Sequence, residues 1–559
     1  MEYYPGRFEK EVNPLLDELA HFQIVKRIWE KDYTVWKDKP DEISNRLGWL
    51  DLPAGMDSKL SGIEDFVNGV LRDGFKMVVL LGMGGSSLAP EVFRLTFGVK
   101  DNHPGMMVLD TTDPVKISEI SGKLDLGTTL FLVSTKSGGT VETLSLMKYF
   151  YNLVASRFGP GKAGEHFVAI TDPGSKLEQI ADSFKFRKAF LNNPDIGGRF
   201  SALSYFGLVP AALTGVDIRK ILEKAKYASE ISKKDSNYIA LFGALTGRLA
   251  ELGADKLTFL TSEKFKYFQA WAEQLIAEST GKEGKGILPV VDEPALDIDS
   301  YSGDRVFVVL KTKNDNSFDQ ALNQLRQKGF PVFVFELNDE YDLGKEFFVW
   351  EFATAVAGWV LKIQPFDQPD VESAKVAARE SIRKYAEEGK LPGPLPDFVF
   401  EEKLKFYGNV QGNTPGEIID NFIKSNVKNS PESYIAIQAF ITPDDDNYKM
   451  LQGLREKLTK KYKLACTVGF GPRFLHSTGQ LHKGDAGHGI FLQFTYEPDV
   501  NLPVPVDLGS EESSITFDVL IKAQALGDRQ ALMNKGRNVL AVDLNYNQKA
   551  NLNFLKENL

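Results

Sequence analysis

The stretch FKMVVLLGMGGSSLAPEVFRLTF, residues 75–97, decides the fold. Its residues 77–81 are apolar without interruption, which is typical of a parallel strand that is buried on both faces. A turn rich in glycine and serine follows, and a helix begins directly after it. The stretch therefore predicts one strand–loop–helix unit of an α/β domain.

The same unit recurs along the chain. Strands are predicted at residues 106–109, 129–133 and 167–171, and each ends in a polar loop that leads into a helix. The pattern starts again at residue 237, with strands predicted at 257–260, 306–310 and 332–335 and a long apolar helix at 347–361. We therefore predict two doubly wound α/β domains, residues 54–236 (the first domain) and 237–390 (the second domain), after an N-terminal helical segment of residues 1–53.

A linker rich in proline and glycine closes the second domain near Asp397. Strands and helices then follow in the order βαββαβ, which predicts a smaller ferredoxin-like α+β domain within residues 398–559, the third domain. Between its second and third strands lies GPRFLHSTGQLHKGDAGHG, residues 471–489. This connection is far longer than a hairpin needs, and long connections tend to be functional.

Two loops that follow predicted strands have the composition of an anion site. In GMGGSS, glycines allow close approach of the backbone and the helix N-terminus offers free N–H groups. In STKSGGT, residues 134–140, the loop offers the hydroxyls of Thr135, Ser137 and Thr140, the charge of Lys136 and a nest of backbone N–H groups. Glycine–serine turns also join strands to helices without binding anything, and GMGGSS lacks the third glycine of a dinucleotide fingerprint.

The composition limits the class of ligand. The 559 residues carry a net charge of −10, which argues against a broad surface for nucleic acid or an anionic membrane, so an anionic ligand needs a local pocket of donors. We see no apolar run long enough for a membrane span and no signal-peptide pattern, and the single cysteine fits a reducing compartment. We therefore expect a cytoplasmic protein. The spacing of the histidines in residues 471–489 matches no zinc signature, so no metal site is expected.

Several motifs resemble those of phosphoglucose isomerases, which interconvert glucose 6-phosphate and fructose 6-phosphate. QLIAESTGKEGKGILPV, residues 274–290, is similar to the family's glutamate motif, and STKSGGT is similar to the sugar-phosphate loop of the SIS (sugar isomerase) fold. GGRFSALSYFGLVPAAL, PFDQPDVESAK and LHSTGQ resemble the arginine, lysine and histidine motifs. The resemblance spans about residues 50–380 firmly.

The resemblance implies an aldose–ketose isomerase that needs no cofactor or metal. Glu278 is then the base that moves a proton between C2 and C1, and Arg199 stabilises the cis-enediol(ate) that forms. Lys375 and His476 open the sugar ring. The implied substrate-binding residues are Gly85, Ser86, Thr135, Lys136, Ser137, Thr140 and Gln274.

His476 stands outside the family's usual order, because it follows Lys375. This order resembles the isomerase half of fused transaldolase–phosphoglucose isomerase proteins. It leaves open whether His476 serves its own subunit or a neighbour in the homodimer that the family leads us to expect. Plainer interpretations are a surface ion pair for Arg199, a solvated helix lysine for Lys375 and a helix-end cap for Glu278. Two other functions also stay open: an isomerase that also accepts mannose 6-phosphate, and a non-catalytic SIS-type sugar-phosphate sensor.

Overall fold

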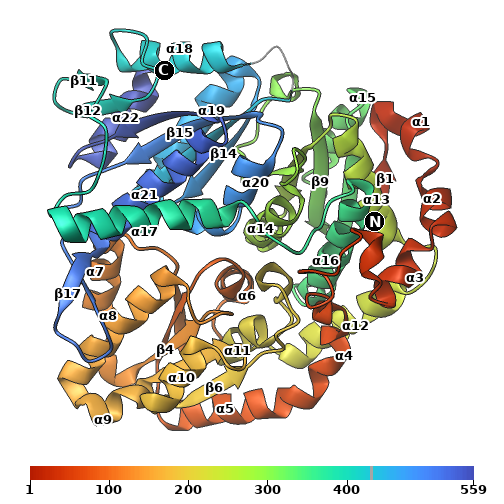
Figure 1. The fold of residues 1–559 in the computed structure, drawn as a ribbon. Coiled ribbons are helices and arrows are strands. Elements are labelled where there is room, and N and C mark those ends of the chain that lie inside the picture. Colours follow the sequence, from red (N-terminus) through yellow and green to blue (C-terminus); the bar gives the residue numbers. More distant parts are fainter. Residues whose placement is uncertain (428–431) are drawn as a thin grey trace.

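Three large sheets covered by helices, together with one two-stranded hairpin, make up the described part of the molecule (Figure 1). The computed structural model describes residues 1–427 and 432–559. Within them, no helix combines the length and the hydrophobicity that crossing a bilayer requires.

The first sheet has the order β3-β2-β4-β5-β6, and all its strands are parallel. The strands are β2 (Met77–Gly82), β3 (Gly105–Leu109), β4 (Thr129–Ser134), β5 (Phe167–Thr171) and β6 (Lys188–Leu191). The four predicted strands are confirmed, and β6 is an addition. The strand order reverses at β2, so the carboxyl ends of β2 and β4 form the crevice where ligands bind in sheets of this kind. GMGGSS and STKSGGT follow these two strands.

The second sheet has the order β1-β10-β9-β7-β8. Its strands are β1 (Glu2–Tyr4), β7 (Lys256–Thr261), β8 (Leu288–Val290), β9 (Arg305–Thr312) and β10 (Val332–Leu337). All pairs are parallel except β1 with β10, which is antiparallel. The N-terminal segment, predicted to be helical, therefore also supplies an edge strand to the second domain.

The third sheet has the order β11-β12-β18-β15-β13-β14. Its strands are β11 (Phe398–Phe400), β12 (Leu404–Tyr407), β13 (Tyr434–Phe440), β14 (Ala465–Phe470), β15 (Gly489–Thr495) and β18 (Asn538–Asp543). β13 is parallel to both β14 and β15, and β15 is parallel to β18.

The ferredoxin-like prediction for the third domain is therefore wrong, because that fold has an antiparallel sheet. The long connection after β14 contains a helix, α20 (Gly479–Gly484), that the sequence pattern did not indicate. With α19 (Asp445–Tyr462) and α21 (Phe517–Asn534), every link between the four central strands carries a helix. Such links permit parallel pairing, and β13 is buried along its whole length as parallel strands are.

Helix α17 (Val371–Glu388) packs along α21 and runs between the first and third domains (Figure 1). Below it, side chains of α21 and of the hairpin β16 (Pro503–Pro505) and β17 (Ser513–Thr516) join the outer core of the first domain.

The other helices of eight or more residues are α5 (Leu60–Arg72), α6 (Leu88–Phe97), α7 (Pro114–Lys123), α8 (Val141–Phe158), α10 (Lys176–Ser183), α11 (Tyr205–Leu213), α12 (Ile218–Ser232), α13 (Tyr238–Glu251), α14 (Phe268–Thr280), α15 (Asp319–Gln327), α16 (Asp342–Val360), α18 (Pro415–Asn426) and α22 (Gln548–Asn558). Besides α20, the short helices of the described residues are α1 (Glu9–Val12), α2 (Leu15–His21), α3 (Ile24–Trp29), α4 (Leu52–Gly55) and α9 (Pro160–Ala163). The predicted domain boundaries stay a prediction. Apart from β1, the strands of each large sheet all lie within a single predicted domain.

Candidate active site

Glu278 lies in the last turn of α14, where the helix dipole disfavours a carboxylate. Two donors offset that cost: Arg199 Nη1 lies 3.2 Å from Glu278 Oε1, and Gln274 Nε2 donates to Oε2 at 3.1 Å. The side chain of Glu278 is 12% exposed. The interpretation as a solvated helix-end cap is therefore wrong.

Arg199 is buried and fully engaged. Its Nε donates to the hydroxyl of Ser279 at 2.7 Å, and Nη1 donates to Gln368 Oε1 at 3.0 Å. Its Nη2 donates to the backbone carbonyls of Pro365 and Asp367. Burial lowers the pKa of the Arg199 guanidinium, and the charge of Glu278 opposes that shift. Arg199 is thus a fixed cation beside Glu278 and not part of a surface ion pair.

The turn that carries Arg199 touches the first anion loop. A Cβ added to Gly85 would lie 2.0 Å from the carbonyl oxygen of Gly198, so only glycine allows this approach. Ser86, next along, is buried. The loop after β2 and the arginine turn are therefore packed backbone to backbone.

The STKSGGT loop has an internal hydrogen-bond network. The hydroxyls of Thr135 and Thr140 lie 2.9 Å apart, and Ser137 Oγ accepts from the backbone N–H of Gly139 at 3.2 Å. Lys136 departs from its predicted role, because its ammonium pairs with Asp172 and donates to the carbonyl of Pro194. In this structure Lys136 contributes its charge to that pair and not to the cavity described below.

His476 reaches this region from the third domain of the same chain. It ends the short 3-10 helix η11 (Arg473–His476), and its Nε2 lies 3.0 Å from Glu142 Oε1. Its backbone carbonyl accepts from Gln274 Nε2 at 2.8 Å. Gln274 therefore connects Glu278 to His476, and residues 471–489 fold over their own second domain.

A cavity of about 260 Å³ lies beside His476. Its polar lining comes from all three domains: Ser137, Thr140, Glu142, Glu372, Lys375, Arg379, His476, Lys483 and Gln524. Lys375 extends from α17 with half of its side chain exposed, 3.7 Å from Glu372. Glu278, Arg199 and Gln274 lie outside this lining and are joined to it by the bond from Gln274 to the His476 carbonyl, so the predicted residues form two adjoining groups.

Glu142 is the main site residue that was not predicted. It lies two residues after STKSGGT, in the first turn of α8. Burial raises its pKa, but the charge and the hydrogen bond of His476 outweigh burial, so the pKa lies below its ordinary value. The acidic residue at the start of a helix was the available signal, because a helix N-terminus favours an ionised carboxylate.

The other two histidines of residues 471–489 have different surroundings. His482 is buried against Tyr434, Phe474 and Phe491, and burial lowers the pKa of its imidazole well below the usual range. His488 lies 3.2 Å from a carboxylate oxygen of Glu432.

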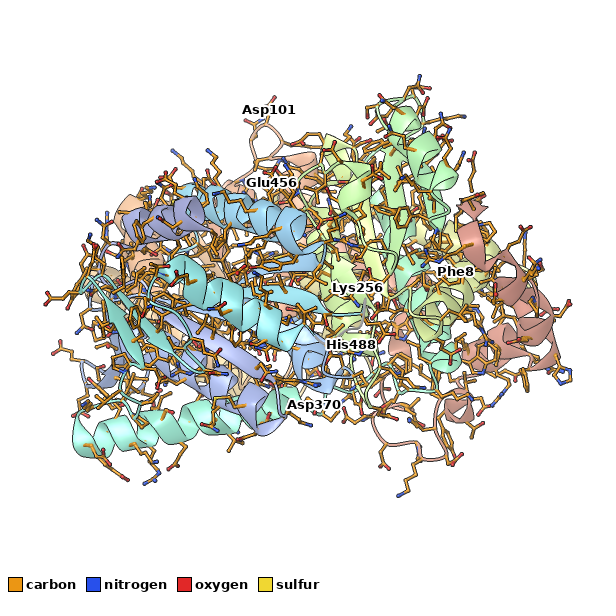
Figure 2. The ribbon with its side chains drawn as sticks, turned by 90° about the horizontal axis from the view of Figure 1, so that it is seen from above. Phe8, Asp101, Lys256, Asp370, Glu456 and His488 are labelled. Carbon is orange, nitrogen blue, oxygen red and sulfur yellow. The ribbon has the colours of Figure 1, made fainter. Side chains whose placement is uncertain are left out.

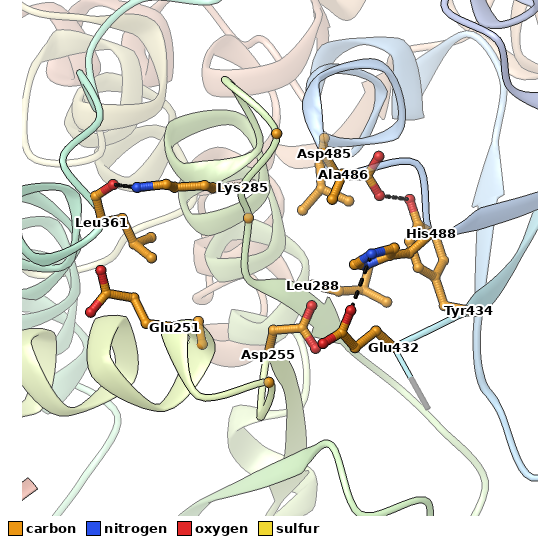
Figure 3. A pocket seen from close by; sticks show the side chains of 15 residues that line it. Glu251, Asp255, Lys285, Leu288, Leu361, Glu432, Tyr434, Asp485, Ala486 and His488 are labelled. Atoms are coloured by element: carbon orange, nitrogen blue, oxygen red, sulfur yellow. Dashed lines mark hydrogen bonds and ion pairs between the residues drawn. The ribbon is translucent and has the colours of Figure 1, made fainter. Parts of the chain in front are cut away.

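His488 also lines a second cavity, of about 430 Å³, between the second and third domains (Figure 3). Figure 2 shows His488 near Lys256, at the boundary between these two domains. The cavity holds Asp255, Lys285 and Tyr434 but none of the residues predicted to act on a substrate. Among the described residues, no group of three or more metal-ligating side chains is arranged to hold a metal ion.

The crevice of a doubly wound parallel sheet, a hydroxyl-rich loop within it and a second α/β layer define the class of SIS-type sugar-phosphate proteins. Within that class, the family description "Phosphoglucose isomerase" matches residues 65–328. Over that region the chain is similar to the phosphoglucose isomerase family, in agreement with the resemblance drawn from its motifs.

Curated relatives agree with this assignment. The glucose-6-phosphate isomerase of Campylobacter jejuni is 29% identical over 389 residues, with 61% of this chain and 94% of the relative covered. The glucose-6-phosphate isomerase of Carboxydothermus hydrogenoformans is 27% identical over 451 residues, with 67% and 96% covered.

Solved structures support the fold. A hypothetical protein from Thermus thermophilus superimposes with a TM-score of 0.56 at 25% identity, over 68% of this chain and 99% of that protein. A glucose-6-phosphate isomerase from Chlamydia trachomatis gives a TM-score of 0.50 at 20% identity, over 68% and 85% of the two chains. The likeness to the second structure is one of fold.

Proposed function

We propose that the protein interconverts glucose 6-phosphate and fructose 6-phosphate by ring opening and proton transfer through a cis-enediol(ate). The observation that carries the proposal is the hydrogen-bonded series from Arg199 and Glu278 through Gln274 to His476, directly beside the STKSGGT loop. A sensor needs the loop but has no use for a carboxylate held between a fixed cation and an amide. The enzyme interpretation is therefore preferred to the sensor.

In this mechanism the hydroxyls and backbone N–H groups of residues 134–140 bind the phosphate. Ionised Glu142 can only accept hydrogen bonds, so the Nε2 atom of His476 that faces it carries a proton. The other ring nitrogen, Nδ1, is then free to exchange a proton with the sugar, and Lys375 lines the same cavity. These two residues open the ring.

Glu278 takes the proton from C2 of the open chain and returns it at C1. The negative charge that develops on the sugar oxygens is stabilised by Arg199, whose position is already fixed by four hydrogen bonds, so little reorganisation is needed. Gln274 holds Glu278 in place through Nε2. The hydroxyl proton on O2 is transferred to O1 as the carbonyl moves from C1 to C2, so proton transfers alone complete the reaction.

Two finer points belong to the same proposal. His476 serves the site of its own chain, because its carbonyl is bonded to Gln274 of that chain. The protein works in the cytoplasm on a small sugar phosphate without nucleic acid, and any homodimer that forms is not needed to complete the site. The affiliation with fused transaldolase proteins stays a prediction.

The test is a coupled assay that follows glucose 6-phosphate formed from fructose 6-phosphate through NADPH. Turnover is expected with the wild type. Binding of a phosphorylated sugar acid without turnover would favour the sensor instead. A parallel measurement of mannose 6-phosphate formation decides whether the specificity is broader.

A further inference from the structure

Gln524 of α21 connects the third domain to the Glu142–His476 pair. Its Nε2 donates to Glu142 Oε1 at 2.7 Å, which is the same oxygen that faces His476 Nε2. Its Oε1 accepts from the hydroxyl of Thr112 at 2.7 Å. Gln524 is 6% exposed and Thr112 is fully buried. Two residues of the first domain and two of the third thus form one chain of hydrogen bonds.

The chemistry of these groups permits only one orientation of the amide. Glu142 is ionised and only accepts, so the NH₂ of Gln524 must face it, and the amide oxygen must face Thr112. The hydroxyl of Thr112 donates to that oxygen and holds the amide in place. A buried network in which every member is satisfied is rigid, and it loses this rigidity when one member is removed.

We propose that Gln524, oriented by Thr112, is a positioning residue for ring opening, because it holds the carboxylate of Glu142 against His476. This inference rests on the proposed isomerase function. The hydrogen bond fixes the position of the Glu142 carboxylate, and Glu142 in turn holds the imidazole with Nδ1 available to the sugar. Gln524 lines the same cavity as His476. Losing the contact between Gln524 and Glu142 should therefore affect the place where the ring opens.

The charged groups around Glu142 make the test specific. His476 of η11 and Lys375 of α17 both favour its ionised form. Glu372 and Arg379 line the same cavity from α17, and Lys483 of α20 is paired with Asp528. A neutral substitution at Gln524 alters none of these charges. Any shift in the titration of Glu142 therefore reports the lost hydrogen bond.

The experiment compares Gln524→Leu and Thr112→Val with the matched control Gln530→Leu, an exposed glutamine of the same helix that bonds Asn534. Turnover of cyclic fructose 6-phosphate should fall roughly 10- to 100-fold in Gln524→Leu, the effect of losing a hydrogen bond to a charged group. Thr112→Val should show a smaller fall, and Gln530→Leu none.

Two readouts separate positioning from a general structural defect. Proton exchange in 5-deoxyfructose 6-phosphate, which lacks the oxygen that closes the ring, should stay within about twofold of wild type. A carboxylate that loses a donor has a higher pKa, so the acidic limb of the kcat/KM profile should move to higher pH in Gln524→Leu. Thr112→Ser keeps the hydroxyl that donates to Gln524, so, unlike Thr112→Val, it should retain the turnover and the pH profile of the wild type.

The inference is overturned if folded Gln524→Leu and Thr112→Val keep wild-type turnover and pH profile. It is also overturned if ring-closed and open-chain substrates are slowed equally. Failure of the proposed function looks different, because the wild type itself would then lack turnover of fructose 6-phosphate.

Discussion

At the scale of single residues, the proposed base Glu278 is held by Arg199 on one oxygen and by Gln274 on the other. Glu278→Gln keeps the shape of the side chain but removes the basic carboxylate. We expect kcat to fall by about 10² or more, the usual scale for losing a general base. Affinity for a phosphorylated sugar acid, measured by calorimetry, should largely survive. Near-normal turnover in this variant would rule out the assignment.

The hydroxyls of the STKSGGT loop should act on binding. Ser137 and Thr140 line the cavity, and donors to a phosphate serve the ground state and the transition state alike. Ser137→Ala and Thr140→Ala should therefore raise KM about tenfold with little change in kcat. Lys136→Ala tests the departure noted above, because its ammonium is bound by Asp172; its effect on KM should be smaller. A loss of kcat at unchanged KM would place the loop in the chemical step.

His482 provides a test of whether a histidine of residues 471–489 has a structural role and not a catalytic one. It fills a space between three aromatic rings, so His482→Ala leaves a cavity and should cost about 2 kcal/mol or more. Thermal unfolding measures this, and His488→Ala, at a partly exposed site, is the matched control. A wild-type unfolding temperature for His482→Ala would contradict the packing described here.

The same residue predicts a dependence of stability on pH. Burial, then the charges of Lys483 and Arg537, lower the pKa of His482, so the folded protein keeps the ring neutral. The unfolded chain binds a proton below about pH 6.5, which makes this contribution to stability full above that pH and lost as the pH falls. His482→Ala should therefore lose less stability than the wild type between pH 7 and pH 5.

At the scale of elements, the contact of α17 with α21 places Lys375. A Cβ on Gly527 of α21 would lie 2.8 Å from the carbonyl oxygen of Ala374, so the helices meet backbone to backbone. Gly527→Val should push α17 outward and slow turnover of the cyclic substrate by about tenfold or more. Gly62→Ala, on a helix face with open space, is the control and should be neutral or stabilising. Unchanged kinetics in Gly527→Val would show that Lys375 does not depend on this contact.

The elements also mark what a single sequence can predict. The buried strands of the first two sheets were predicted to within about two residues, because short apolar runs bounded by turn and loop residues are typical of buried parallel strands. β1, β6 and β8 have only three or four residues, too few for a period to show. α20 reads GQLHKG, which is buried all round and has two glycines, so no amphipathic pattern indicated it. Missing that helix produced the ferredoxin-like error.

The candidate site likewise contains residues that the sequence could predict and contacts that it could not. Glu278, Arg199 and His476 stand in motifs, and the structure places them in one connected region. Gln524 lies 382 residues from the glutamate that it contacts, and no local pattern encodes such a pair. A substrate-binding role was predicted for Lys136 from the composition of its loop. Its ammonium instead pairs with Asp172, which directly follows the next strand, β5.

At the scale of the whole molecule, one chain supplies all the proposed catalytic groups. Specific activity should therefore stay constant on dilution, whatever the oligomeric state measured by sedimentation. A mixture of Glu278→Gln and His476→Ala proteins tests the same point. It should stay as inactive as its components, because neither chain can lend its intact residue to the other. Recovery of activity on mixing would mean that His476 acts across a subunit interface.

The strand β1 has a consequence for synthesis on the ribosome. Tyr4 pairs with Val332, so β1 is made roughly 330 residues before its partner, or about 20 to 70 seconds earlier at ordinary rates of translation. During that interval the nascent N-terminal segment has no edge of the second sheet on which to dock. The first sheet draws its strands from residues 77–191 and can close while the ribosome still translates the second domain. A chaperone that shields the early segment would therefore be needed most before residue 337 has emerged.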